Sequence, residues 1–355
     1  MLIKLMQDPW DKNIKIEGNS YFNNGELIVS KINNINNEFI HIDLFSGCGG
    51  FSTGFEQSGF VTELAIDIHT PSIETIKYNH KNTSTILGDI RKVSSDLTKS
   101  LISNLNAKII LTAGVPCQGF SISNRKRNDD DDRNFYFREF IRFAKFLKPE
   151  VLILENVSGI TSAKNGFFID SITSEIGNLN YKVYSSFINS EDYGVPQKRK
   201  RYFFVGVKKK YNWLFPNKTH NLSNHITVKE AILEDLPKLD NNSEAHDYSA
   251  KPSNDFLKII RNSQVKLLNH KSPNHPDKTI NMIKNTQQGE PMYHSFKQRI
   301  RLNSNLPSPT QVCGGIRPQF QFGHPIQNRG LTIRERARIQ SFPDNYFFTG
   351  GIVQG

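Results

Sequence analysis

The sequence predicts a doubly wound α/β fold with a second, smaller domain. Apolar runs of strand length recur between residues 39 and 207, and amphipathic stretches lie between several of them. Such alternation is typical of βαβ units and therefore of a parallel sheet covered by helices. The alternation stops near residue 208, where a segment rich in Asn, Lys, His, Pro and Ser begins. At 355 residues, the chain is long enough for two domains.

Six segments have the short, apolar character of buried strands. They are Phe39–Phe45, Val61–Ile66, Ile109–Ala113, Val151–Leu154, Lys182–Phe187 and Tyr202–Val207. Phe135–Leu147 repeats apolar residues at spacings of three and four, which predicts a helix. A further helix is expected over Thr332–Ser341, because Thr332 and Glu335 have the spacing of a capping box and Pro343 ends the pattern.

These elements divide the chain into four parts. Residues 1–38 are polar and rich in asparagine, and we expect a peripheral N-terminal extension. Residues 39–210 form the predicted sheet domain, and residues 211–330 form the smaller domain. Residues 331–355 are expected to return to the sheet domain.

Charge and cysteine content narrow the class of protein. The net charge is +11, and residues 251–300 contribute nine basic and three acidic side chains. A basic surface attracts polyanions such as DNA, although a bias for solubility explains the same excess equally well. Three cysteines without a CxxC spacing disfavour a disulfide scaffold or a zinc site. The sequence has neither an apolar run of membrane-spanning length nor a secretory signal, and we expect a cytoplasmic protein with no membrane partner.

A glycine-rich loop follows the first predicted strand. Residues 43–51 read D-L-F-S-G-C-G-G-F, and the GxGG spacing differs from the GxGxxG of dinucleotide-binding loops. Asp67 follows the next predicted strand, where an acidic side chain can bind ribose hydroxyls, and Asp89 is a second acidic residue in the segment that comes after it. This combination indicates a nucleoside site without a pyrophosphate. A tight turn beside surface acids is the alternative.

Cys117 lies behind Pro116, just past the strand Ile109–Ala113. Open α/β sheets place their chemistry at such strand ends, but an isolated cysteine is more often a small buried apolar residue. Its thiol, with an ordinary pKa of about 8.5, also needs activation before it attacks. Glu155 ends the next buried strand and would stand beside Cys117 if the two strands are neighbours. A helix cap is the alternative for Glu155-Asn156.

Alternation along Gln197–Arg201 places Arg199 and Arg201 on one face of a strand. A guanidinium beside Glu155 could fix a ring carbonyl. A solvated basic edge strand is the alternative.

Together, these segments resemble the DNA cytosine-5 methyltransferases. The matching motifs occur in the family's order across roughly residues 39–350. They are Asp43–Gly50, Asp67, Gly88–Ile90, Pro116–Gln118, Phe120–Ser123, Asp132–Asn134, Glu155–Val157, Gln197–Arg201, Arg301-Leu302, Pro307–Thr310 and Leu331–Pro343.

The resemblance implies a Rossmann-like, S-adenosylmethionine-dependent methyltransferase sheet over residues 39–210 and a target-recognition domain over residues 211–330. The implied reaction is methyl transfer from S-adenosyl-L-methionine to C5 of a cytosine flipped out of double-stranded DNA. The type is that of a bacterial or phage restriction-modification enzyme, which implies a cognate restriction endonuclease as partner. No metal is implied.

The resemblance also assigns roles to individual residues. Cys117 would add to C6 of the cytosine, Glu155 would hold its amine and N3, and Arg199 would hold its O2 carbonyl. The residues implied for the cofactor are Phe45, Gly47, Gly49, Asp67, Asp89 and Pro116. Those implied for DNA are Gln118, Ser121, Ser123, Arg133, Arg201 and Arg301.

Two departures from the family stand out. The family usually ends with a helix that begins near Gly-Asn-x-Val-Pro, whereas this sequence stops at Gly355. Either this sequence is a piece of a longer protein, or another polypeptide supplies that helix. Tyr136 occupies a position where leucine is more usual, and we expect a minor effect on the cofactor pocket.

Three other functions are alternatives to this one. A tRNA cytosine-5 methyltransferase of the same architecture would carry a Cys-Phe-Thr tripeptide in its recognition region, but no cysteine lies between Cys117 and Cys313. A catalytically silent DNA-binding homologue that needs a partner subunit is disfavoured by the presence of Cys117, Glu155 and Arg199. A nicotinamide-dependent oxidoreductase would need a pyrophosphate loop that the sequence lacks.

Overall fold

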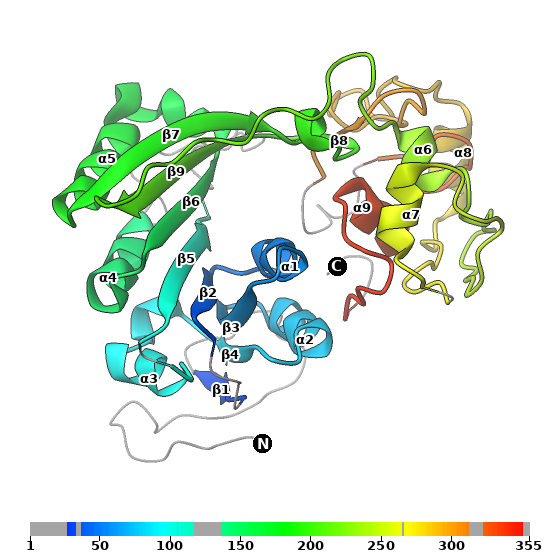
Figure 1. Cartoon of the computed structure of the whole chain (residues 1–355). Helices are drawn as coiled ribbons and strands as arrows, with labels where there is room; N and C mark the ends of the chain where they lie inside the picture. The colour runs from blue at the N-terminus through cyan, green and yellow to red at the C-terminus, as the bar shows by residue number, and fades with distance from the viewer. Residues whose placement is uncertain are drawn as a thin grey trace. The chain divides into compact units, whose positions relative to one another are not determined.

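The computed structural model describes residues 27–32, 37–104, 106–116, 136–264, 266–311 and 322–350. The chain forms two compact units (Figure 1). The first unit extends to Ile188 and includes Lys200–Pro216. The second unit comprises Asn189–Arg199 and the chain from Asn217 onward.

The first unit contains, within its described residues, an eight-stranded sheet with the order β1-β4-β3-β2-β5-β6-β9-β7 (Figure 1). Strands β4, β3, β2, β5 and β6 are parallel, whereas β1 and β9 run antiparallel to β4 and β6. The strands are β1 (Ile28–Ser30), β2 (Phe39–Leu44), β3 (Val61–Asp67), β4 (Ser84–Leu87), β5 (Lys108–Gly114), β6 (Val151–Val157), β7 (Tyr181–Asn189) and β9 (Lys200–Lys208). The predicted doubly wound fold is therefore confirmed, and each of the six predicted strands is present.

Helices of this unit pack against the sheet. Helices α1 and α2 contact β3, α4 contacts β5, and α5 contacts β9. The helices are α1 (Gly50–Gln57), α2 (Thr70–Asn79), α3 (Ser95–Ser100), α4 (Phe137–Leu147) and α5 (Phe167–Asn178). The amphipathic pattern of α4 buries Phe140, Phe143 and Ala144 in the same core as Leu111 of β5 and Leu152 of β6.

The strand order places a switch point between β2 and β5. From β2 the chain winds outward through β3 and β4, and it then returns to β5 on the other side of β2. Open α/β sheets bind ligands outside the carboxyl ends of the strands at such a point. Next to it, β5 pairs with β6 so that Gly114 lies opposite Glu155. The strand that leads to Cys117 and the strand that carries Glu155 are therefore neighbours, as the sequence interpretation required.

Part of the predicted N-terminal extension belongs to the sheet. Ile28 pairs with Leu87 across β1 and β4 and packs against a cluster of Ala65, Ile73, Ile76 and Leu87. The short apolar segment of β1 covers an edge that would otherwise stay unpaired, which explains its place in the fold. The expectation of a purely peripheral segment over residues 1–38 is therefore corrected for β1, while residues 1–26 lie outside the described residues.

The second unit contains short helices and, in its described residues, a two-stranded parallel ladder of β8 (Gln197–Lys198) and β10 (Ser308–Pro309). Its helices are α6 (Val228–Ile232), α7 (Asp255–Arg261), α8 (Asp277–Lys284) and α9 (Ile333–Ile339). The core gathers Val228, Ala231 and Ile232 of α6 with Leu302 and Ile339. The predicted capping box of α9 is confirmed: Thr332 Oγ1 accepts from Glu335 N at 3.1 Å, and the Glu335 carboxylate accepts from Thr332 N at 2.8 Å.

Residues 331–350 were expected to rejoin the sheet domain, but they pack within the second unit. Arg338 of α9 is fully buried and forms ion pairs with Asp235 at 2.5 Å and Asp344 at 2.6 Å. Since a buried guanidinium needs such partners, Asp235 after α6 and Asp344 hold α9 in this unit. Residues 189–199 also belong here, because β8 pairs with β10.

Within the described residues, no helix is both long and apolar enough to cross a membrane.

Candidate active site

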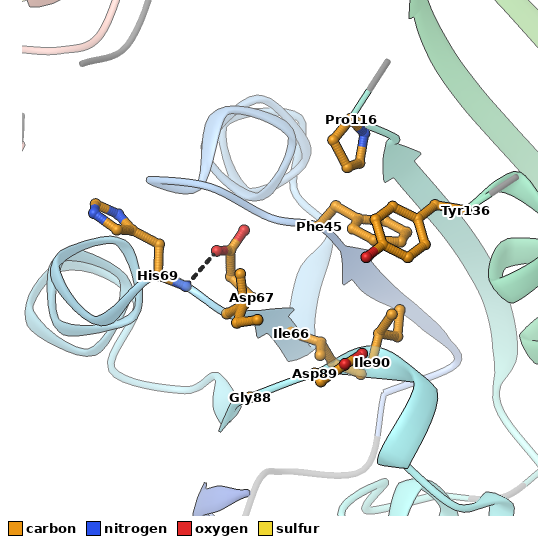
Figure 2. A pocket seen from close by; sticks show the side chains of 11 residues that line it. Phe45, Ile66, Asp67, His69, Gly88, Asp89, Ile90, Pro116 and Tyr136 are labelled. Carbon is orange, nitrogen blue, oxygen red and sulfur yellow. Dashed lines mark hydrogen bonds between the residues drawn. The ribbon is translucent and has the colours of Figure 1, made fainter. Parts of the chain in front are cut away.

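A pocket of about 230 Å³ lies at the carboxyl ends of β2, β3, β4 and β5 in the first unit (Figure 2). Its walls come from the residues that follow these strands and from the start of the segment leading into α4. They are Phe45, Ile66, Asp67, Ile68, His69, Gly88, Asp89, Ile90, Gly114, Pro116 and Tyr136. Of the six residues predicted for the cofactor, four therefore line one pocket, and Gly47 and Gly49 lie in the loop beside it.

The loop between β2 and α1 has the backbone conformation that its glycines predict. Gly47 and Gly49 adopt φ values of 52° and 82°, in the left-handed region that favours glycine. Gly47 N donates to Asp67 Oδ2 at 2.8 Å, so the loop is tied to the end of β3. Phe45 also has a positive φ, 53°, which is unusual for a bulky residue and often marks a functional constraint. Its ring forms one wall of the pocket.

Two carboxylates line the pocket in different environments. Burial raises the pKa of Asp67 above its ordinary value, against hydrogen bonds from the backbone N–H groups of His69 and Gly47 that lower it. Partial burial would also raise the pKa of Asp89, but the hydrogen bonds and the charge of Arg91 outweigh burial and lower it. Both Asp89 oxygens face Arg91, with the shortest contact, Nη2 to Oδ2, at 2.5 Å. Two carboxylates suit hydroxyl and amine donors and repel a phosphate group.

An aromatic pair forms the wall that faces these carboxylates. The rings of Phe45 and Tyr136 have centroids 5.8 Å apart at an interplanar angle of 37°, and Figure 2 shows them beside Pro116. The Arg91 guanidinium lies over the Tyr136 ring, 5.8 Å from its centroid. Tyr136 was not among the predicted site residues. The only signal in the sequence was its departure from leucine, and the structure makes it a pocket wall.

Glu155 lies next to this pocket, near the carboxyl end of β6. A Cβ placed on Gly114 would lie 3.9 Å from both Glu155 Oε2 and the Phe45 carbonyl oxygen. The ends of β2, β5 and β6 therefore converge at Gly114, which itself lines the pocket. Cys117 follows Gly114 by three positions in the sequence but lies outside the described residues, as do Gln118, Ser121, Ser123 and Arg133.

The guanidinium beside Glu155 belongs to Arg201. Its Nε lies 2.9 Å from Glu155 Oε1, and both side chains are largely buried. Strand β9 runs antiparallel to β6 with Arg201 opposite Val157 and Phe203 opposite Glu155, so Arg201 lies diagonally across from Glu155. The sequence interpretation gave this position to Arg199 and assigned Arg201 to DNA. Arg199 belongs to the second unit, where its backbone N donates to Glu191 Oε2 at 3.2 Å, and its contact with the base stays a prediction.

Arg301, another residue predicted to contact DNA, forms hydrogen bonds within the second unit. Its guanidinium donates to backbone carbonyl oxygens in the second unit, namely those of Ile283, Lys284, Thr286, His324 and Pro325. Its Nε and Nη1 donors are thus engaged by the chain itself, and a contact between Arg301 and DNA stays a prediction.

Comparisons with known proteins agree with this geometry. The sequence profile of the family described as C-5 cytosine-specific DNA methylase matches residues 39–354. The Type II methyltransferase M.DdeI of Desulfomicrobium norvegicum is 36% identical over 335 residues, which cover 87% of this chain and 80% of that protein. The Type II methyltransferase M1.HphI of Haemophilus parahaemolyticus is 32% identical over 322 residues, with coverage of 87% and 79%.

Solved structures are similar over almost the same span. A prophage-encoded protein of E. coli, described as a DNA modification methyltransferase, superposes with a TM-score of 0.72 at 27% identity, covering 89% of this chain and 91% of that one. The Dnmt2 methyltransferase of S. pombe superposes with a TM-score of 0.55 at 15% identity, covering 88% and 89%, which shows a shared fold. The profile match, the relatives and the strand-end pocket together show that the chain belongs to the C-5 cytosine-specific DNA methylase family.

Proposed function

We propose that this DNA cytosine-5 methyltransferase holds S-adenosylmethionine in the pocket at the ends of β2 to β5 and holds the target cytosine between Cys117, Glu155 and Arg201. The observation that carries the proposal is the convergence at Gly114. This residue lines the pocket and also lies opposite Glu155. A methyl donor in the pocket and a base at Glu155 would therefore meet at the strand that leads to Cys117.

The residues of the pocket fit the methyl donor chemically. Phe45 and Tyr136 offer aromatic surface for an adenine ring, Asp67 can accept from ribose hydroxyls, and Asp89 can accept from the adenine amine. Acidic walls also suit a positively charged sulfonium that has no phosphate. When bound, S-adenosylmethionine supplies an electrophilic methyl group.

The chemistry at the base follows from the low nucleophilicity of cytosine C5. The Cys117 thiolate would form a bond to C6, which makes C5 electron-rich. Glu155 would hold the amine and N3 of the ring, and Arg201 would hold the O2 carbonyl. Once C5 carries the methyl group, a base such as water or hydroxide would take the C5 proton. The electrons of the C5–H bond then re-form the C5–C6 double bond as the C6–S bond breaks and the Cys117 thiolate leaves. The Glu155–Arg201 ion pair would orient both side chains before the base arrives.

We assign DNA recognition to the second unit. The seven lysines of residues 251–300 are all exposed, namely Lys251, Lys258, Lys266, Lys271, Lys278, Lys284 and Lys297. Contacts between such lysines and DNA phosphates would make the affinity depend on salt. The logarithm of the binding constant falls with the logarithm of the salt concentration, with a slope of about −0.9 for each neutralised phosphate. Replacing Lys251, Lys271, Lys278 and Lys284 with glutamine should lower this slope. The same number of exchanges at Lys77, Lys81, Lys92 and Lys99 of the first unit is the control.

The Type II relatives also suggest a partner. We propose that a restriction endonuclease with the same target sequence acts beside this enzyme. Sequencing of 5-methylcytosine in DNA from cells that express the chain would give the target. The expected nuclease cuts that sequence when it is unmethylated and spares it after methylation.

The direct test measures methylated nucleosides by mass spectrometry after incubation of the chain with S-adenosylmethionine and either duplex DNA or tRNA. The proposal expects 5-methyldeoxycytidine from DNA and none from the Cys117→Ser variant. Methylation of tRNA alone would identify the RNA branch. Retained DNA binding without methylation of either substrate would identify a silent homologue.

A further inference from the structure

A chain of buried hydrogen bonds runs beneath the pocket through β3, β2, β5 and α1. Thr62 Oγ1 lies 2.9 Å from His41 Nδ1, and His41 Nε2 lies 2.8 Å from Thr112 Oγ1. Thr112 Oγ1 donates to Asp43 Oδ1 at 2.9 Å. Ser52 donates to Asp43 Oδ2 through its hydroxyl at 2.8 Å and through its backbone N at 3.2 Å. These side chains are all fully buried.

When Asp43 is ionised, only one assignment of donors and acceptors satisfies all of these hydrogen bonds. A hydroxyl has one proton, and Thr112 gives its proton to Asp43, so it must accept from His41 Nε2–H. His41 is then the neutral Nε2–H tautomer, and its Nδ1 accepts from the Thr62 hydroxyl. Burial lowers the pKa of His41 to about 3, which agrees with a neutral ring. Burial raises the pKa of Asp43 to about 7, although hydrogen bonds from Ser52 and Thr112 lower it, so these hydrogen bonds end on a carboxylate above about pH 7.

Asp43 supplies what the start of α1 lacks. The N-cap of α1 is Gly49, which has no side chain to accept from the first N–H groups of the helix. Asp43 Oδ2 accepts from Ser52 N in this first turn, although Asp43 lies on β2 before the loop. One carboxylate thus spans the glycine-rich loop and fixes its two ends relative to each other. Its other oxygen joins β2 to β5 through Thr112, two residues before Gly114 of the pocket.

We propose that Asp43 is a positioning residue for methyl-donor binding. By holding α1 and β5 against the end of β2, it sets the places of Phe45 and Gly114 in the pocket walls. Asp43 does not itself line the pocket, so it acts through these residues. The inference rests on the proposed place of S-adenosylmethionine.

The structure offers a matched control for this role. Glu63 on β3 is also fully buried, and its carboxylate accepts from a serine in the same way, with Ser103 N at 2.9 Å and Ser103 Oγ at 2.5 Å. Neither Glu63 nor Ser103 lines the pocket. Asp43→Asn and Glu63→Gln each remove a buried charge and replace one acceptor oxygen with an amide NH2 donor, and only the first does so in the link across the loop.

The experiment measures the Kd and the KM for S-adenosylmethionine of the full chain and its variants, together with their melting temperatures. Asp43→Asn should raise both constants about tenfold, the effect of a lost hydrogen bond to a charged group, and should leave kcat within about threefold. Glu63→Gln should lower the melting temperature but leave both constants within about twofold. Equal changes in the two variants, or an unchanged Kd for Asp43→Asn, would overturn the inference.

A second pair of variants decides the question if Asp43→Asn does not fold. Ser52→Ala removes only the hydroxyl from Asp43 and should raise the Kd about threefold, whereas Ser103→Ala should not change it. An unchanged Kd for Ser52→Ala would contradict the role of Asp43. The tautomer of His41, read from its ring ¹⁵N shifts at pH 8, should be Nε2–H. An Nδ1–H tautomer would contradict the donor and acceptor roles assigned to the hydrogen bonds between Thr62 and Asp43.

One further variant separates this inference from the proposed function. Phe45→Ala removes a wall of the pocket and should weaken S-adenosylmethionine binding whatever the role of Asp43. Unchanged binding by Phe45→Ala would overturn the proposed pocket, and the inference with it. Weakened binding by Phe45→Ala beside unchanged binding by Asp43→Asn would overturn only the inference.

Discussion

Arg201 and Glu155 form an ion pair across β9 and β6, with Nε and Oε1 2.9 Å apart. The pair lies near the carboxyl end of β6, the strand that pairs with β5. A Cβ on Gly114 of β5 would lie 3.9 Å from the same carboxylate. A guanidinium and a carboxylate held together in this way present donors and acceptors side by side, as the edge of a cytosine requires. The second arginine of the Gln197–Arg201 motif, rather than the first, is therefore the stronger candidate for contact with the base.

This assignment predicts unequal effects at the two arginines. Arg201→Ala should lower kcat/KM about 100-fold, because it removes a donor to the ring and leaves Glu155 without its ion pair. Arg199→Ala is the matched comparison and should lower kcat/KM less than Arg201→Ala does. The measurement is single-turnover methylation of duplex DNA. A larger loss at Arg199 would restore the interpretation made from the sequence.

The aromatic wall predicts a graded effect at Tyr136. Tyr136→Leu restores the residue that is more usual in the family but removes the ring packed on Phe45, so it should raise the KM for S-adenosylmethionine about threefold. Tyr136→Phe keeps the ring and should stay near the unmodified enzyme. Steady-state kinetics at saturating DNA measures both. An equal rise in KM for Tyr136→Phe and Tyr136→Leu would assign the effect to the hydroxyl, which both variants lack, and would contradict the role of the ring.

Buried histidines predict that the second unit loses stability in acid. Burial lowers the pKa of His324 to about 3 and that of His275 to about 4, whereas both titrate near 6.5 when unfolded. Protons therefore bind the unfolded state first. The stability that these neutral rings contribute is fully present above about pH 6.5 and is lost as the pH falls toward 4 and 3.

Hydrogen exchange of the α9 amides at pH 7.5 and pH 5.0 can measure this loss, after correction for the intrinsic exchange rates. His324→Gln should reduce the pH dependence of the opening free energy of α9 by up to about 1.4 kcal/mol per pH unit. His294, an exposed histidine of the same unit, provides the control variant His294→Gln, which should leave the pH dependence of α9 exchange unchanged. Equal slopes for all three proteins would show that His324 is not the titrating group.

The sequence was informative wherever one local pattern decides a structure. The apolar runs predicted six of the eight strands described in the sheet, all but β1 and β4. Thr332 with Glu335 predicted the start of α9, because capping depends on residues three positions apart. The position of Glu155 beside the strand to Cys117 also followed, since carboxyl ends of neighbouring parallel strands meet at one edge. Asp67 lines the pocket, and the glycine loop lies beside it, bonded to Asp67 through Gly47.

Other features depend on pairings that no local pattern specifies. Alternation placed Arg199 and Arg201 on one face, but the chain passes from β8 in one unit to β9 in the other between them. Strand β1 is short and joins the sheet only because β4 offers an edge. Helix α9 belongs to the second unit through the burial of Arg338 between Asp235 and Asp344, which are distant from each other in sequence.

The most direct test of the account traps the proposed bond between Cys117 and the target base. Fluorine at C5 of cytosine cannot leave as the proton does, so elimination of the cysteine is blocked after methyl transfer. Intact mass spectrometry of the enzyme, incubated with S-adenosylmethionine and a duplex that carries 5-fluorocytosine at the target, should detect a covalent adduct of enzyme and methylated DNA. Digestion should locate the adduct on Cys117, and Cys117→Ala should form none. An adduct that persists in Cys117→Ala, or its absence from an unmodified enzyme that methylates ordinary DNA, would contradict the account.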